Sequence, residues 1–123
     1  MTTMQIVYLT ADLLFASRIE QAARQQSVGL SIVRNAEAAL AAIGEQTQLL
    51  MIDLTLSGLD IASLVADARD SYPTLQILAY GPHVQAARLE AAREAGCHQV
   101  LTRGQFDREA TAIISAANRP TDS

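Results

Sequence analysis

The sequence of 123 residues contains no lysine and no tryptophan, and it has only one cysteine and two histidines. The single Cys97 excludes a disulfide within the chain, and its expected role is that of a small buried apolar side chain. With so few cysteine and histidine ligands, no metal cluster is expected. All nine basic residues are arginines, scattered among 13 acidic residues, and the net charge is −4. The chain therefore lacks the basic face with which proteins bind nucleic acid directly.

Long apolar runs are also missing. No run approaches the length that spans a membrane, and the N-terminus has no signal-type segment in which charged residues precede apolar ones. We therefore expect no membrane contact and a cytoplasmic protein. Aromatic residues make up only 4%, yet half of all residues are hydrophobic, so a core of alanine, leucine, isoleucine and valine can form. The length predicts one domain over residues 1–118 and a flexible tail at 119–123.

The stretch Leu49–Leu54 places a single aspartate, Asp53, in an otherwise apolar run. An apolar run bounded by turn residues is typical of a strand that is buried on both faces. A lone carboxylate is costly to bury inside such a strand, so Asp53 is predicted at its carboxyl end. In open α/β sheets, this edge is where ligands bind.

Strand-like runs alternate with helical patterns along the whole sequence. The predicted strands cover 5–9, 30–33, 49–54, 75–80 and 100–101. The first two predicted helices follow the capping residues Asp12 and Asn35, and the other three cover 59–71, 84–95 and 106–117. The inward stripe of the first helix is predicted to be Leu13, Leu14, Ile19, Ala22 and Ala23. This alternation predicts an α/β fold of the flavodoxin-like, doubly wound type, with five parallel strands in the order 2-1-3-4-5 and helices on both faces.

Four loops are expected to meet at the carboxyl edge of this sheet, because they follow neighbouring strands. They contribute Thr10, Ala11 and Asp12 after the first strand, Asp53, Thr55 and Ser57 after the third, Gly81, Pro82 and His83 after the fourth, and Thr102, Arg103 and Gly104 after the fifth. We therefore expect the functional residues among them.

Over nearly its whole length the sequence resembles the receiver domain of bacterial response regulators, the CheY-like family. The segment 52–60 is similar to the family's phosphoacceptor segment, in which an apolar strand ends in an aspartate and a loop follows. The segment 95–97 is similar to the family's Ala-Gly-Ala, and 100–103 is similar to its Phe-Leu-Thr-Lys. The resemblance implies that Asp53 occupies the phosphoacceptor position.

The rest of the receiver apparatus departs from the family pattern. Receivers hold Mg²⁺ with a pair of acids after the first strand, and here these positions are Thr10 and Ala11. Asp12 is similar to the residue just beyond the pair, which caps the first helix. The hydroxyl residue after the fourth strand is replaced by Gly81, and the lysine after the fifth strand by Arg103. We therefore expect weak or absent Mg²⁺ binding, no other cofactor and no catalytic residue.

Within this degenerate pocket, which also includes Thr55, Asp53 is expected to form an ion pair with Arg103. Such a pair would hold one conformation. We therefore interpret the chain as a pseudo-receiver: a stand-alone, atypical receiver-like signalling module that works independently of phosphorylation, by protein–protein contact, and is not an enzyme.

The partner is expected to be a protein such as a histidine kinase or an output protein. A homodimer is a further expectation, formed through the face of helix 84–95, strand 100–101 and helix 106–117, which receivers use for such contacts. The candidate residues on this face are Gln85, Arg88, Arg93, Val100, Asp107 and Arg108.

Two alternatives remain open from the sequence. The first is a true phosphoacceptor at Asp53 in a two-component phosphorelay. The second, of a different class, is a STAS-like regulator of the anti-sigma-factor-antagonist type, which segments 52–54 and 58–60 resemble. The fivefold alternation of strands and helices argues against this second alternative. An enzyme acting on small substrates is disfavoured, because the sequence has no glycine-rich phosphate loop and no Ser–His–Asp pattern.

Overall fold

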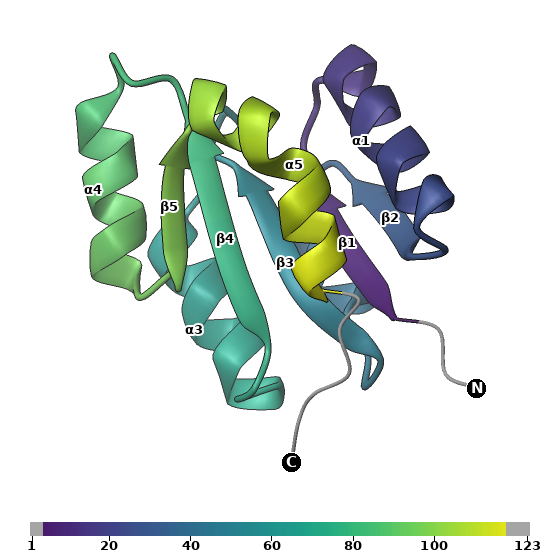
Figure 1. The fold of residues 1–123 in the computed structure, drawn as a ribbon. Helices are drawn as coiled ribbons and strands as arrows, with labels where there is room; N and C mark the ends of the chain where they lie inside the picture. The colour runs from purple at the N-terminus through teal and green to yellow at the C-terminus, as the bar shows by residue number, and fades with distance from the viewer. Residues whose placement is uncertain (1–3, 118–123) are drawn as a thin grey trace.

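Residues 4–117 are described by the computed structural model, and they form one sheet with helices on both sides (Figure 1). The strands are β1 (Gln5–Leu9), β2 (Gly29–Val33), β3 (Thr47–Asp53), β4 (Gln76–Gly81) and β5 (Gln99–Thr102). The helices are α1 (Leu13–Gln25), α2 (Ala36–Ala42), α3 (Ile61–Ser71), α4 (Ala86–Ala95) and α5 (Arg103–Ala117). Position 118 of the predicted domain and the predicted tail at 119–123 lie outside the described residues.

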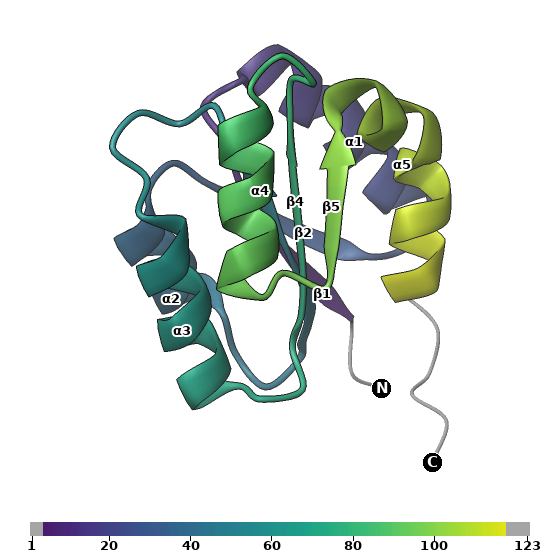
Figure 2. The same cartoon turned by 90° about the vertical axis from the view of Figure 1, so that its left-hand side faces the viewer.

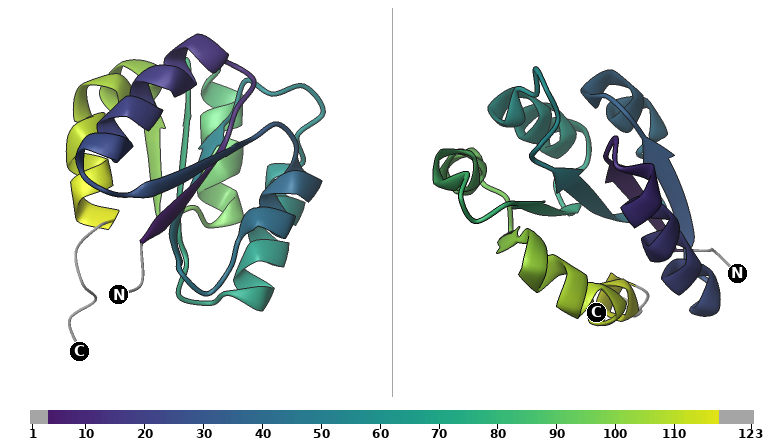
Figure 3. Two further views of the ribbon diagram at one scale, coloured as in Figure 1. Left: turned by 90° about the vertical axis from the view of Figure 1, so that its right-hand side faces the viewer. Right: turned by 90° about the horizontal axis from the view of Figure 1, so that it is seen from above.

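The parallel strands are ordered β2-β1-β3-β4-β5, which confirms the predicted doubly wound α/β fold. Helices α1 and α5 cover one face of the sheet, and α2, α3 and α4 cover the other (Figures 2 and 3). Because all strands run in the same direction, the loops after β1, β3, β4 and β5 meet at one edge. No helix within residues 4–117 is long and apolar enough to cross a membrane.

Strand β3 lies at the centre of the sheet and is buried on both faces. Leu50 and Ile52 belong to the apolar cluster beneath α2, α3 and α4, whereas Leu49 and Met51 belong to the cluster beneath α1 and α5. Full burial of one such side chain contributes about 1.5–3 kcal/mol. Asp53 ends the strand, as predicted from the lone carboxylate in an apolar run.

Three helices begin at a side chain that accepts a backbone hydrogen bond. The carboxylate of Asp12 caps α1, the amide oxygen of Asn35 caps α2, and the carboxylate of Asp60 caps α3. Each such cap contributes about 1 kcal/mol. The caps at Asp12 and Asn35 are those predicted from the sequence. The left-handed backbone of Gly96, with φ of 97°, ends α4.

Helix α5 begins at Arg103, three residues earlier than the sequence predicts. Thr102 and Gln105 explain this start, because each side chain bonds to the other residue's backbone. The Gln105 N–H donates to the Thr102 hydroxyl at 3.2 Å, and the Thr102 N–H donates to the Gln105 side-chain oxygen at 2.9 Å. This reciprocal pattern is a capping box. Arg103 and Gly104 are therefore the first residues of a helix and not part of a loop.

The inward face of α1 also differs from the prediction. Leu13 is 49% exposed and Leu14 is 86% exposed, so the predicted stripe is wrong at its start. The buried residues of the helix are Phe15, Ala16, Ile19 and Ala23. Phe15 supplies the large apolar side chain at the start of the buried face, and the two leucines before it lie at the edge of the sheet.

Candidate functional site

Asp53 is only 1% exposed, and both oxygens of its carboxylate accept hydrogen bonds. Its Oδ2 accepts from the Thr10 hydroxyl at 2.7 Å. Its Oδ1 accepts from the backbone N–H and the hydroxyl of Thr55, at 2.9 and 2.7 Å. Uncharged donors therefore satisfy the buried carboxylate, which without partners would carry a large desolvation cost.

Thr10 connects Asp53 to the turn between β1 and α1. The residue is fully buried, and its backbone N–H donates to the Val33 carbonyl of β2 at 2.9 Å. While its hydroxyl donates to Asp53, the same oxygen accepts from the backbone N–H of Asp12 at 3.1 Å. One threonine side chain thus joins the ends of β1 and β3.

Arg103 forms its ion pair with Asp12, so the predicted pair with Asp53 is wrong. Its Nη2 donates to Asp12 Oδ2 at 2.8 Å, and its guanidinium carbon lies 4.7 Å from the centre of the Phe15 ring. The hydrogen bond from Arg103 lowers the pKa of Asp12, and the bond from the Phe15 N–H lowers it further. The reason is geometric: Arg103 stands half-exposed at the start of α5, beside the cap of α1, while Asp53 is buried with both oxygens occupied.

A buried aromatic cluster lies on the α1 and α5 side of the sheet. The hydroxyls of Tyr8 and Tyr80 are 2.5 Å apart, and both side chains are fully buried. Tyr80 stacks on Phe106 with ring centres 4.1 Å apart, and Phe15 completes the cluster. Burial raises the pKa of both tyrosines, and the charge of Asp53 raises it further. Tyr8 is absent from the predicted site residues, because its strand is apolar and its partner lies 72 residues away.

The remaining pocket residues lie at the same edge of the sheet. Gly81 is the last residue of β4 and is buried, and a Cβ on it would lie 3.3 Å from Leu54 Cβ. The Nη1 of Arg88 donates to the Leu54 carbonyl at 2.6 Å, which ties the loop after Asp53 to α4. Ala11 is exposed on the loop after β1. The structure therefore gathers Thr10 and Thr55 around Asp53, and Arg103 around Asp12. The Asp12 N–H, which donates to the Thr10 hydroxyl, links the two groups.

Three of the six residues predicted for a partner face are engaged within the chain. Arg88 bonds to a backbone carbonyl, Arg93 lies 3.9 Å from Glu90, and Asp107 pairs with Arg18 at 3.1 Å. Gln85 and Val100 are half-buried, while Arg108 is exposed. The six residues belong to α4, its N-cap, the edge strand β5 and α5.

The residues present do not fit a receiver-type Mg²⁺ site. Mg²⁺ binds oxygen ligands in octahedral geometry and relies on carboxylates. Across residues 4–117, no three histidine, cysteine, aspartate or glutamate side chains come together in a way that could hold a metal ion. Asp53 is the one carboxylate of the buried network, and the oxygens of Asp12 are held by Phe15 N–H and Arg103. Within the described residues, the arrangement bonds the loops after β1 and β3 to each other and does not match the ligand set of a receiver-type Mg²⁺ site.

Comparison of the structure with solved proteins gives matches over nearly the whole chain. A two-component response regulator from Clostridium difficile superposes with a TM-score of 0.80, covering 98% of this chain and 100% of that chain at 17% identity. This chain has the CheY-like receiver fold. The receiver domain of NtrX from Brucella abortus matches with a TM-score of 0.75 at 17% identity, covering 91% and 96% of the two chains. An orphan response regulator of H. pylori matches with a TM-score of 0.75 at 15% identity, covering 96% and 98%.

The sequence itself carries little of this likeness. No protein-family model matches it, and a search of curated proteins finds no match. At identities below one fifth, the receiver comparison establishes the fold, and the chemistry has to be argued from the side chains around Asp53.

Proposed function

We propose that this protein is a receiver-fold signalling module that works without phosphorylation of Asp53, through contact with a protein partner in the cytoplasm. One observation carries the proposal: both oxygens of Asp53 are occupied by uncharged donors from Thr10 and Thr55. The carboxylate is 1% exposed, which leaves little access for a phosphodonor. Among residues 4–117, no group of three histidine, cysteine, aspartate or glutamate side chains could hold a metal ion.

Phosphoryl transfer to a carboxylate brings two anions together. A divalent cation normally neutralises the transferred group, and catalysis consists mostly of that stabilisation and of positioning. Here Arg103, a cationic side chain at this edge, is engaged by Asp12. Asp53 acts instead as an internal acceptor that fixes the loops after β1 and β3, and the protein is a binding module rather than an enzyme.

Exposed apolar side chains at the same edge support a contact with a partner. Leu14 at the start of α1 is 86% exposed, and Val84 before α4 is 77% exposed. Leu13 is also half-exposed. The loops at this edge are held in one conformation and carry exposed apolar side chains. Such a surface can bind a protein partner without prior phosphorylation, for example a histidine kinase or an output protein. The face of α4, β5 and α5 remains the proposed surface for a homodimer.

The test is treatment of the purified protein with acetyl phosphate and Mg²⁺, followed by intact mass measurement. We expect no phosphoryl adduct on the wild type or on Asp53→Asn, while a receiver known to react takes up phosphate in the same buffer. An adduct on the wild type that Asp53→Asn abolishes would overturn the proposal. It would establish the phosphoacceptor alternative and turn the search towards a histidine kinase.

A further inference from the structure

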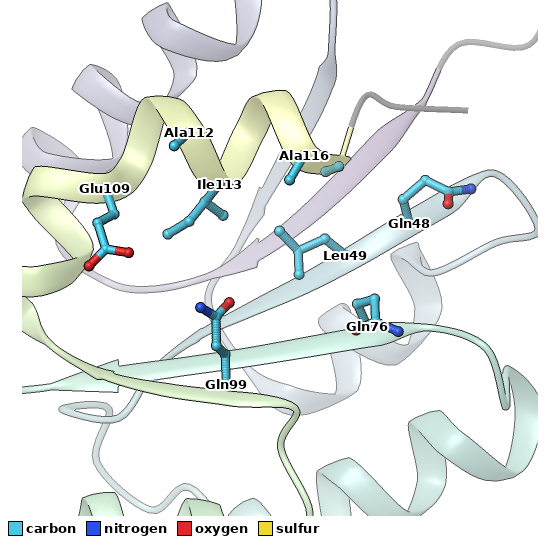
Figure 4. Close-up of a pocket in the computed structure, with 9 residues that line it drawn as sticks. Gln48, Leu49, Gln76, Gln99, Glu109, Ala112, Ile113 and Ala116 are labelled. Carbon is cyan, nitrogen blue, oxygen red and sulfur yellow. The ribbon is translucent and has the colours of Figure 1, made fainter. Parts of the chain in front are cut away.

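A cavity of about 330 Å³ lies between α5 and the first residues of β3, β4 and β5 (Figure 4). These strands begin at the opposite end of the sheet from Asp53. Three glutamines, Gln48, Gln76 and Gln99, contribute one carboxamide from each strand, and Glu109 contributes a carboxylate from α5. The volume is within the range of small-molecule sites.

The positions of the glutamines on the sheet are unusual. Side chains along a strand alternate between faces, so Gln76 shares its face with Leu78 and Tyr80, which belong to the core beneath α1 and α5. Gln99 stands opposite Leu78 and shares that face as well. Both glutamines are exposed, because α5 does not close over this end of the sheet. Gln76 and Gln99 thus occupy core-facing positions at the end of the sheet where the cavity opens.

Gln48 reaches the cavity for a different reason. The pairing of β3 with β1 shifts by one residue here: Gln5 pairs with Thr47 and Ile6 pairs with Leu49. Gln48 is the extra residue of this bulge, and bulges re-aim side chains. In Figure 4 the carboxamide of Gln48 lies at one end of the cavity and Glu109 at the other.

The four polar side chains of the cavity have no partner within residues 4–117. The carboxamides of Gln48, Gln76 and Gln99 and the carboxylate of Glu109 take part in none of the side-chain hydrogen bonds or ion pairs of the described residues. Three carboxamides can each donate and accept, and the carboxylate accepts only. Polar groups that converge on a cavity beside an apolar wall are the pattern of a ligand site.

The chemistry of the lining selects the ligand. Glu109 is the one ionisable group among the lining residues, so the cavity favours a cation and disfavours an anion. The lining contains no aromatic ring, so it offers neither a stacking surface for a flat base nor a cage for a quaternary ammonium ion. Leu49 and Ile113 form an apolar wall beside the polar groups (Figure 4), along which methylene groups can pack.

We propose that this cavity binds a small aliphatic amine. A primary ammonium group donates to the Glu109 carboxylate at one end of the cavity, and the methylene chain lies against Leu49 and Ile113 towards the end that holds Gln48. An ammonium carries three donors and no acceptor, which matches a carboxylate that only accepts. The site does not involve Asp53, so it stands whether or not Asp53 is phosphorylated.

The test is a titration of the full-length protein with 1,4-diaminobutane, followed by NMR of the backbone amides. We expect shifts confined to the starts of β3, β4 and β5 and to α5. The neutral 1,4-butanediol and the anionic succinate, which have the same chain length, should cause none. Glu109→Gln should weaken diamine binding by about tenfold or more, because the ammonium loses its charged acceptor.

Glu94→Gln is the matched control, since it removes the same charge from an exposed position on α4. It should leave the affinity for the diamine unchanged, which separates a site from general attraction to a chain with a net charge of −4. Equal weakening by both variants, shifts spread over all acidic side chains, or no shifts at all would overturn the proposal. Both glutamates are on the surface, and circular dichroism verifies that the variants remain folded.

Discussion

At the scale of the residue, Asp53 depends on Thr10 in a way that can be measured. Thr10→Val keeps the shape of the side chain but removes the hydroxyl that donates to Asp53 Oδ2. A buried acceptor is then left without its partner, so the free energy of unfolding should fall by about 1–3 kcal/mol. Urea denaturation near neutral pH measures the difference.

Thr55→Val is the comparison for Thr10→Val. It also removes a hydroxyl from Asp53, but the Thr55 backbone N–H continues to donate to Oδ1, and residue 55 is exposed. The loss of stability should therefore be the smaller of the two. Equal losses would show that the burial of Thr10 and the remaining Thr55 N–H do not set the difference. No loss for Thr10→Val would show that the buried carboxylate does not depend on the Thr10 hydroxyl.

Asp12 gives a pH-dependent prediction. Its pKa is lowered in the folded protein, first by the bond from Arg103 and then by the Phe15 N–H. The stabilisation from this group is therefore present above its pKa in the unfolded chain, and it is lost as the pH falls through the lower folded value. Asp12→Asn should lower stability near neutral pH and flatten the decline of stability in acid. The midpoints of urea denaturation, measured for both proteins between about pH 2 and 7, test both effects.

The effect of Asp12→Asn should be modest, because the pair is partly exposed and solvent screens it. Asparagine also retains the helix-capping oxygen, so the cap itself is preserved. If the stability of Asp12→Asn fell as steeply with decreasing pH as that of the wild type, other carboxylates would be the cause of the pH dependence.

The residue scale is where the sequence predicted least. The position of Asp53 at a strand end followed from the cost of burying a carboxylate. The partner of Arg103 did not, because it depends on where α5 starts, and that start is set by bonds between Thr102 and Gln105. The spacing of a threonine and a glutamine three residues apart was a usable signal for the capping box. The contact of Tyr8 with Tyr80 had no local signal.

At the scale of the element, the end of α4 requires glycine. Gly96 has φ of 97°, and a Cβ on it would lie 3.0 Å from Arg69 Nη1. Gly96→Ala should cost about 1–2 kcal/mol, because L-residues are strained in the left-handed region. In Gly44→Ala, by contrast, no atom beyond the neighbouring residues of the chain lies within 4 Å of the new Cβ, and φ is not positive. That variant should be neutral or more stable by up to about 1 kcal/mol.

Thermal unfolding of Gly96→Ala and Gly44→Ala under the same conditions measures this contrast. If both variants lost the same stability, the cost would arise from the added methyl group in general and not from the backbone of Gly96. The two glycines also differ in how well they mark a helix end. Gly96 is itself the C-terminal cap of α4, so the glycine marks where that helix stops. The cap of α2 is Ile43, one residue before Gly44, so the glycine does not mark that end.

At the scale of the whole molecule, the fold followed from the alternation of strands and helices. Short apolar runs bounded by turn residues, such as those of β3 and β4, are typical of strands in a sheet covered on both faces, and short connections leave few topologies. The alternation of strands and helices did not predict how much of the sheet each helix covers. Leu14 was predicted to be buried and Gln76 belongs to a core-facing row, yet both are exposed at the ends of α1 and β4.

The proposed absence of Mg²⁺ binding also concerns the whole edge, and it can be tested by adding one carboxylate ligand. Ala11 is exposed and stands at one of the two acid positions that the resemblance to receivers implies, whereas Thr10 is buried and bonded to Asp53. Mg²⁺ should not change the melting temperature of the wild type. Ala11→Asp should gain stability with Mg²⁺, by about 1.4 kcal/mol when free Mg²⁺ is ten times the dissociation constant. Adding Asp53→Asn should remove this gain. A wild type that is already stabilised by Mg²⁺ through Asp53 would mean that the edge holds the ion without a second carboxylate.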